Sequence, residues 1–287
     1  MILHMAVHDR LRHIEGRHNA LVKELRRAFS QGEATPDGYF AIEGFRVLEE
    51  AIRSGLRFKA VFFSNSAEPR AKRILPQLGT HVETILLPDK LFAAAVPTES
   101  PQGVAALVRM KEFSLDDILA RAQSGPVLAV AGLQDPGNLG TILRSAEAFG
   151  AAGLLLGEGT VSPLNPKVVR ASAGSVFRLA FVQTELMGSL DALRERGLRL
   201  FATSSHKGIP LDEAKLTGPA AVFIGNEGAG LDRKLLSQMD ELIAIPHAPQ
   251  VESLNAGVAA SIVLYEIARQ QRALTTETQS QRERRTI

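Results

Sequence analysis

The most constraining feature of this sequence is a set of short, uninterrupted apolar runs that each end in a polar loop. Ala221–Ile224 is followed by GNEGAG, and Leu242–Ile245 is followed by PHAPQVESLN. Runs of this length between turn signals are typical of strands buried on both faces of a parallel sheet. Ligands bind at the carboxyl ends of such strands, which is where both loops lie. The stretch Ala221–Arg269 therefore predicts a binding site built largely from backbone groups and small residues.

Upstream of this stretch, further apolar runs alternate with helical patterns. After the first of them, Leu139, Ile142, Leu143 and Ala146 recur at helical spacing, and Asn138 is placed to cap that helix. Strands that alternate with helices predict a mostly parallel α/β sheet. The runs expected to be strands are Pro126–Leu133, Gly153–Leu156, Phe177–Val182 and Leu198–Thr203.

The amino-terminal third predicts a second, smaller α/β unit. A helical pattern at His18–Ser30, with Asn19 as its cap, precedes short runs rich in Val and Phe. A chain of 287 residues has the length of two domains. We expect the division to be a binding domain at residues 1–110, a linker at 111–124, a larger domain at 125–271 and a disordered polar tail at 272–287.

Composition narrows the function by what it lacks. The sequence has no cysteine, which excludes disulfides, thiolate metal sites and a cysteine nucleophile. Its longest apolar stretch, Ala256–Leu264, is too short to span a bilayer. We therefore expect a cytoplasmic protein that uses no metal and does not associate with a membrane.

The charge distribution leaves two interpretations of the chain ends open. The net charge is +2, from 33 basic and 31 acidic residues, and does not by itself indicate a nucleic-acid partner. The simpler interpretation of the basic clusters at the two ends is a solvated helix face and a frayed tail. The alternative is a patch that faces phosphates. The clusters are Arg10, Arg12, Arg17, Lys23, Arg26 and Arg27 at one end and Arg282, Arg284 and Arg285 at the other.

Absent motifs disfavour many nucleotide-dependent and hydrolytic enzymes. A dinucleotide fold requires G-x-G-x-x-G after its first strand, but the candidate that begins at Gly157 has Ser162 in place of its third glycine. The segment Gly225–Gly230 has its glycines in the wrong order. The sequence contains no G-x-x-x-x-G-K-[ST], H-E-x-x-H or G-x-S-x-G motif. A Rossmann-type nucleotide enzyme is therefore disfavoured.

Six segments carry a resemblance to a known family. RHNALVKEL, FAIEGFRVLEEAI and TESPQGVAA are similar to the substrate-binding domain of many SpoU (TrmH-type) RNA methyltransferases. NLGTILRSAEAFGA, AVFIGNEGAGL and IPHAPQVESLNAGVAASIVLYE resemble, in that order, the three motifs of the SpoU branch of the SPOUT superfamily. The resemblance covers nearly all of the chain up to about Arg269.

The resemblance implies a fold, a reaction and partners. The larger domain would contain a deep carboxyl-terminal trefoil knot, bind S-adenosylmethionine and form a homodimer. The smaller domain would hold RNA. The implied reaction transfers a methyl group to a ribose 2′-hydroxyl, with ribosomal RNA as the first expectation. A transfer RNA methyltransferase and a catalytically silent RNA-binding protein on the same fold are the alternatives.

The resemblance also implies the residues of a cofactor site. Contacts made largely through backbone groups are expected from Gly225, Ile245 and Leu254, with Thr203, Asn226 and Gly230 as further candidates. Glycines let the chain approach a ligand closely and adopt positive φ. An ordinary turn after a strand is the alternative explanation of the glycines. The loop His247–Glu252 departs from the family pattern because it lacks the usual glycine, and we interpret His247 as a loop residue.

The catalytic group implied by the resemblance is Arg144, surrounded by Asn138, Glu227, Ser253 and Asn255. An arginine is effectively always protonated and is a poor base, so we expect Arg144 to stabilise the developing alkoxide and to bind a neighbouring phosphate. Asn138 and Asn255 suit hydrogen bonding to RNA or to Arg144. Glu227 is a candidate to orient Arg144, and a carboxylate at a helix entry is its alternative role. The alternative for Arg144 itself is a surface ion pair with Glu147 at i+3.

Overall fold

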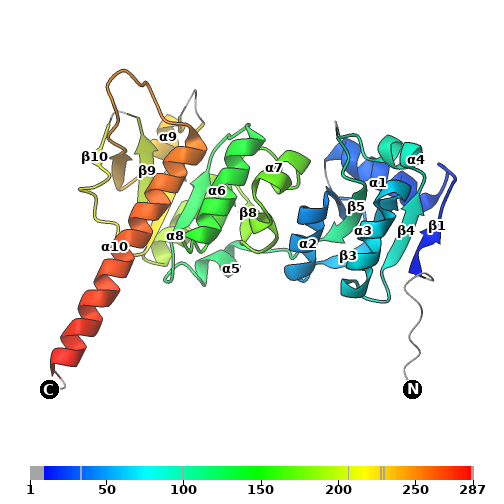
Figure 1. Cartoon of the computed structure of the whole chain (residues 1–287). Coiled ribbons are helices and arrows are strands. Elements are labelled where there is room, and N and C mark those ends of the chain that lie inside the picture. The colour runs from blue at the N-terminus through cyan, green and yellow to red at the C-terminus, as the bar shows by residue number, and fades with distance from the viewer. Residues whose placement is uncertain are drawn as a thin grey trace. The chain divides into compact units, whose positions relative to one another are not determined.

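A computed structural model describes residues 10–285 of the chain, except residues 33, 99, 206, 227 and 229, and describes side chains as far as residue 274. The chain forms two compact units (Figure 1). Unit 1 comprises the chain up to Glu112 together with Ser162–Phe177, and unit 2 comprises Phe113–Val161 and everything from Arg178 onward. Both are α/β, as the alternation of apolar runs and helical patterns predicts.

Unit 1 is built on a 5-stranded mixed sheet in the order β1-β4-β3-β5-β2. β3 pairs in parallel with β4, while β5 is antiparallel to both β3 and β2. Its elements are β1 (Arg12–His13), α1 (Ala20–Gln31), β2 (Phe40–Glu43), α2 (Phe45–Arg53), β3 (Arg57–Ser64), α3 (Glu68–Ile74), β4 (Glu83–Leu87), α4 (Asp89–Ala95), β5 (Val104–Arg109) and α7 (Pro166–Ala171), with 3₁₀ turns at Asn65–Ala67, Leu75–Gln77 and Ser175–Phe177.

Helix α1 follows from its sequence signals. The Asn19 side chain accepts a hydrogen bond from the Leu21 N–H at 2.9 Å, which confirms the expected cap, and Gly32 ends the helix with φ 63°. The apolar face of α1 is buried with α4 against one face of the sheet. The residues of that core include Val22, Leu25, Phe29, Phe62, Ile85, Phe92 and Leu107.

The segment Ser162–Phe177 packs within unit 1 although its sequence lies inside the larger predicted domain. Helix α7 contacts β2, and Val168 and Val169 are buried. The rings of Phe177 and Phe40 have their centroids 6.4 Å apart. The domain division drawn from the sequence did not include this excursion, because the segment's apolar residues do not reveal which core they join.

Unit 2 is built on a 7-stranded sheet in the order β10-β12-β9-β11-β6-β7-β8, and every neighbouring pair is parallel. The predicted parallel sheet is confirmed. Its elements are α5 (Leu115–Leu119), β6 (Val127–Val130), α6 (Pro136–Ala148), β7 (Gly153–Leu156), β8 (Phe181–Gln183), α8 (Leu186–Glu195), β9 (Arg199–Ser204), β10 (Ile209–Pro210), β11 (Ala220–Ile224), α9 (Arg233–Leu236), β12 (Glu241–Ala244) and α10 (Ala256–Arg285).

Helices cover both faces of this sheet. Apolar residues of α5, α8 and α9 pack with Val127, Ala129 and Phe223 on one face. Because side chains alternate along a strand, Leu128 and Val130 face the other side. Helices α6 and α10 lie side by side there (Figure 1) and contact each other extensively. Burial on both faces explains why these strands read as continuous apolar runs.

Two segments differ from the sequence-based expectation. The expected linker at 111–124 contains α5, whose Ile118 and Leu119 are buried in the core of unit 2, and Ser114 forms a capping box with Asp117. The expected tail at 272–287 continues α10 as far as Arg285. Good helix formers such as Gln, Glu and Arg dominate the end of that segment, and no glycine or proline interrupts it.

Within the described residues, no helix is long and apolar enough to cross a membrane, and no cluster of His, Cys, Asp and Glu suits a metal ion.

Candidate active site

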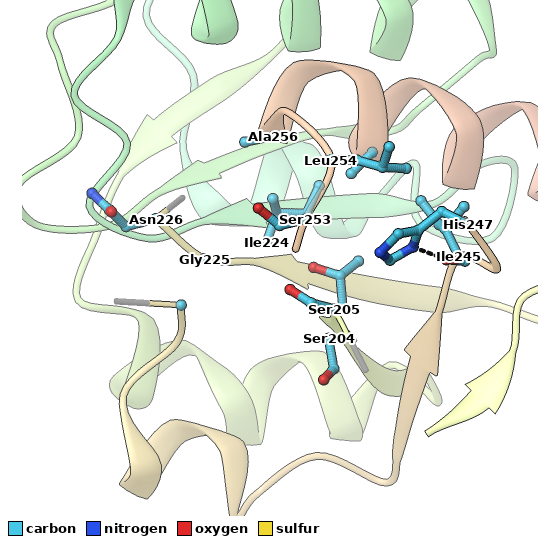
Figure 2. A pocket seen from close by; sticks show the side chains of 13 residues that line it. Ser204, Ser205, Ile224, Gly225, Asn226, Ile245, His247, Ser253, Leu254 and Ala256 are labelled. Atoms are coloured by element: carbon cyan, nitrogen blue, oxygen red, sulfur yellow. Dashed lines mark hydrogen bonds between the residues drawn. The ribbon is translucent and has the colours of Figure 1, made fainter. Parts of the chain in front are cut away.

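A cavity opens in unit 2 at the carboxyl ends of β9, β11 and β12 (Figure 2). Its space free of atoms is about 610 Å³, a figure that includes open solvent at its mouth. Its lining residues are Thr203, Ser204, Ser205, Ile224, Gly225, Asn226, Gly230, Ile245, His247, Ser253, Leu254, Ala256 and Ala259.

The loop after β11 is held in shape by its own backbone. Asn226 and Gly230 form an isolated antiparallel bridge, and the Asn226 Nδ2 donates to the Gly132 carbonyl at 2.7 Å. A Cβ added to Gly225 would lie 2.3 Å from the Gly230 carbonyl carbon, so only glycine fits there. Gly230 has φ +67°, a conformation that favours glycine. The glycines of this loop therefore serve both a tight turn and a close approach of two chain segments.

The cavity wall offers hydrogen-bonding groups but little charge. Thr203, Ser204, Ser205 and Ser253 supply hydroxyls, while Ile224, Ile245, Leu254 and two alanines supply apolar surface. Among the described lining residues, His247 alone is titratable. Such a wall can hold a flat, partly apolar group whose polar atoms are recognised by backbone groups and hydroxyls.

Beside the cavity, an asparagine pair ties α6 to the start of α10. The Asn255 Nδ2 donates to Asn138 Oδ1 at 2.8 Å, and Asn255 Oδ1 accepts from the Val258 N–H at 3.2 Å. Asn138 is buried, and its N–H donates to Asp135 Oδ1 at 2.7 Å. The expectation that Asn138 caps α6 is therefore wrong: Asp135 is the cap, because the helix begins earlier, at Pro136.

Close packing of the two helices supports this pair. A Cβ on Gly257 would lie 3.1 Å from Thr141 Cβ, so α10 approaches α6 closely at that point. One turn further along, Ser145 Oγ and Ser261 Oγ are 2.7 Å apart and share a hydrogen bond. Asn138 and Asn255 are thus held on a rigid two-helix support.

Arg144 lies on α6 with its side chain exposed and does not line the cavity. Its guanidinium makes no hydrogen bond or ion pair with any described residue. The suggested surface pair with Glu147 is absent, because the Glu147 carboxylate is bound by Arg178 at 2.5 and 3.0 Å. None of the described residues therefore occupies the donors of Arg144. Glu227, its expected orienting partner, lies outside the described residues.

Displaced pKa values occur away from the cavity lining. Hydrogen bonds from Ser66 hold the pKa of Asp89 below its usual range. On α10, a hydrogen bond from Arg269 lowers the pKa of Glu266. The cavity itself offers hydroxyls and backbone groups, which suit chemistry driven by alignment and electrostatic stabilisation.

Comparison with known proteins assigns a family. Residues 125–265 match the model of the SpoU rRNA methylase family, and residues 19–106 match an MRM3-like substrate-binding domain. The chain is 34% identical over 257 residues to the 23S rRNA (guanosine(2553)-2′-O)-methyltransferase RlmP of Bacillus subtilis. The aligned region covers 90% of this chain and 99% of the relative. The chain belongs to the SpoU methylase family.

Solved structures of SpoU methyltransferases agree with this assignment. The methyltransferase AviRb of Streptomyces viridochromogenes, in complex with the cofactor AdoMet, matches with a TM-score of 0.76 at 29% identity, over 88% of this chain and 98% of that one. An AdoMet-bound rRNA methyltransferase from Sinorhizobium meliloti matches with a TM-score of 0.76 at 25% identity, over 91% and 98%. The resemblance drawn from the six segments is confirmed.

Several residues proposed from the SpoU motifs come together in the structure. All the expected cofactor contacts line the cavity, and so does Ser253 from the expected catalytic set. Asn138 and Asn255 bond to each other beside it, whereas Arg144 stands apart from the lining. Sequence reasoning missed Ser204, Ser205, Ala256 and Ala259 and set His247 aside. Of these residues, only Ser204 and Ser205 could have been predicted from the sequence, because they directly follow a predicted strand and ligands bind at the carboxyl ends of such strands.

Proposed function

We propose that this SpoU family member transfers a methyl group from S-adenosylmethionine to a ribose 2′-hydroxyl in ribosomal RNA. The observation that carries the proposal is the cavity at the ends of β9, β11 and β12, lined by every residue expected to contact the cofactor. The relatives from Bacillus subtilis and Sinorhizobium meliloti are named as rRNA methyltransferases. The structures from Sinorhizobium meliloti and of AviRb have AdoMet bound. No observation favours transfer RNA, and the presence of Asn138, Arg144 and Ser253 argues against a silent RNA-binding protein.

The residues present fit the cofactor. Backbone groups of Gly225, Ile245 and Leu254 would hold it, with Thr203, Asn226 and Gly230 completing the wall. The narrow approach between Gly225 and Gly230 leaves backbone, without side chains, facing that part of the cavity. When bound, S-adenosylmethionine supplies a methyl group on a positively charged sulfur. The leaving group departs neutral, so this chain needs no general acid.

The protein's own task is to align the attacking hydroxyl and to stabilise its oxygen as it loses a proton. We assign that stabilisation to Arg144, whose guanidinium also suits an adjacent phosphate. One such donor contributes about 3 kcal/mol, or roughly 10²–10³ in rate. Asn138, Asn255 and Ser253 would orient the ribose and its neighbours. We keep Glu227 as the candidate that orients Arg144.

Substitution of Arg144 tests this assignment. Arg144→Ala should lower kcat by roughly 10²–10³, while calorimetric affinity for S-adenosylmethionine stays unchanged because Arg144 does not line the cavity. Arg144→Lys keeps the charge but loses the planar fork and should recover only part of the rate. Methylation at an unchanged rate in the alanine variant would remove Arg144 from the mechanism.

We further propose that the amino-terminal domain expected at residues 1–110 holds the RNA. Arg17, Lys23, Arg26 and Arg27 on and before α1 have exposed side chains that suit phosphate contacts. Arg10 does not share that task, because its guanidinium donates to the carbonyls of Leu75, Leu78 and Gly79 at 2.8, 3.2 and 3.0 Å.

Two further properties follow from the family. We propose that residues 125–271 form the knotted methyltransferase domain and that two copies associate through α10. In support of association, Val258 and Tyr265 expose 46% and 50% of their surface on one side of that helix, next to Ile262. Tyr265 packs edge-on against Phe149, with ring centroids 5.8 Å apart. Because its substrate would be ribosomal RNA, we place the protein in the cytoplasm.

A further inference from the structure

The loop between β12 and α10 forms one wall of the cavity, and it turns without glycines or left-handed backbone conformations. The stretch Ile245–Asn255 contains no glycine, and no residue in it has a left-handed φ. Pro246 and Pro249 have no N–H to donate. One backbone hydrogen bond, from the Val251 N–H to the Ala248 carbonyl at 3.0 Å, closes a turn inside the loop.

The His247 ring contacts the backbone at the start and in the middle of this loop. Its Nδ1 lies 2.7 Å from the Ile245 carbonyl oxygen, and its Nε2 lies 3.1 Å from the Val251 carbonyl oxygen. Figure 2 shows the ring beside Ile245 at one end of the cavity, with Asn226 at the other. A single side chain therefore sets the separation of two backbone segments, the first of which contributes Ile245 to the cavity wall.

The chemistry of the ring makes the two contacts unequal. A carbonyl oxygen only accepts, and a neutral imidazole carries one N–H. The shorter distance favours the tautomer with its hydrogen on Nδ1, which donates to the Ile245 carbonyl; in that neutral tautomer Nε2 carries no hydrogen and only packs against the Val251 carbonyl. The bond to Ile245 is thus the one on which the loop most depends.

We propose that His247 is a positioning residue for the cofactor: its ring fixes the Ile245–Val251 loop so that the backbone of Ile245 and Leu254 faces S-adenosylmethionine. His247 substitutes for the conformational freedom that a glycine would give this loop, since a side-chain tie and not a special φ holds the turn. The inference rests on the proposed function, because it assumes that the cavity binds this cofactor.

Three variants of His247 separate its two contacts. In His247→Asn the amide nitrogen takes the place of Nδ1, in His247→Gln it takes the place of Nε2, and in His247→Ala both contacts are lost. Gln250→Ala is the matched control, because Gln250 is exposed in the same loop and lies outside the cavity lining. Thermal unfolding of each variant establishes that it is folded.

The measurements are the calorimetric Kd for S-adenosylmethionine and the separate values of kcat, KM for cofactor and KM for RNA. Loss of hydrogen bonds of ordinary strength predicts that His247→Ala raises the Kd and the cofactor KM about tenfold. The kcat at saturating cofactor and the KM for RNA should not change. His247→Asn should restore most of the affinity, His247→Gln less, and Gln250→Ala should match the unsubstituted protein.

The inference would be overturned if all three His247 variants bound S-adenosylmethionine with the affinity of the unsubstituted protein. A fall in kcat with an unchanged cofactor KM would also overturn it. An asparagine variant no better than alanine would also overturn it. If the unsubstituted protein itself failed to bind S-adenosylmethionine, the proposed function would be wrong, and the role of His247 that rests on it would be wrong too. The two failures are therefore distinguishable.

Discussion

Replacing Gly225 by alanine should strongly weaken the use of the cofactor while leaving the protein folded. The added Cβ would lie 2.3 Å from the Gly230 carbonyl carbon and 2.6 Å from the Leu231 nitrogen. Ordinary carbon contacts are about 3.5–4.0 Å, so the two segments must separate by about 1 Å or more. Both Gly225 and Gly230 line the cavity, and the separation therefore distorts its wall directly.

The size of the effect follows from that displacement. A misplacement of about 1 Å costs roughly 10²-fold in rate, and overpacking of this kind costs about 1–3 kcal/mol of stability. We expect Gly225→Ala to lower kcat/KM for S-adenosylmethionine about 100-fold and to unfold at a lower temperature than the unsubstituted protein. Calorimetry measures the Kd for S-adenosylmethionine, methylation kinetics with radiolabelled cofactor measure kcat/KM, and thermal unfolding measures stability.

Gly228 provides the matched control within the same loop. A Cβ there would meet its nearest neighbour, Asn226 Oδ1, at 3.5 Å, which is an ordinary contact. The Gly228 φ is not in the left-handed region, and its N–H would still donate to Asn226 Oδ1. Gly228→Ala should therefore bind cofactor normally. Normal binding by Gly225→Ala would refute the assignment of this loop to the cofactor.

The remaining predictions concern α10 and the asparagine pair that joins its start to α6. Asn138→Ala and Asn255→Ala should each lower the free energy of unfolding. A double-mutant cycle should give a coupling energy of about 0.5–1.5 kcal/mol between the two side chains, the net value of one hydrogen bond. Zero coupling would contradict the 2.8 Å contact between Asn255 Nδ2 and Asn138 Oδ1. The hydrogen bond from Arg269 lowers the pKa of Glu266. This pair therefore stabilises the fold above a pH of about 4.5, and the stabilisation is lost as the pH falls through the lowered pKa. Glu266→Gln should reduce the dependence of thermal stability on pH in that range. Tyr265→Glu should convert the proposed dimer into monomers in sedimentation analysis, and an unchanged mass would exclude this face of α10 as the interface.

The sequence predicted the architecture of unit 2 because its strands are buried on both faces. Such strands are uninterrupted apolar runs, and the loops that follow them mark the ligand-binding edge of a parallel sheet. The cavity at the ends of β11 and β12 was accordingly expected from Ala221–Ile224 and Leu242–Ile245. The order of the strands was not, since β9 lies between β11 and β12 only through tertiary packing.

Side-chain roles were harder to predict, because they depend on atoms far apart in the sequence. The glycine at 225 was expected for its approach to a ligand, yet the structure shows a close approach to the chain's own backbone at Gly230. Asp135, not Asn138, caps α6, and Asn138 is instead available to Asn255, 117 positions away. His247 was interpreted as an ordinary loop residue because nothing in the sequence shows that both its nitrogens meet backbone carbonyls.

The most direct test of the proposed function is an assay with the purified protein, ribosomal RNA and labelled S-adenosylmethionine, followed by mass spectrometry of the digested RNA. The proposal predicts label on the ribose of a defined nucleotide, absent when Arg144→Ala replaces the unsubstituted protein. Ribose methylation at the same nucleotide should also disappear from the RNA of cells that lack the gene. Label on a base, or no label in any ribosomal RNA, would contradict it.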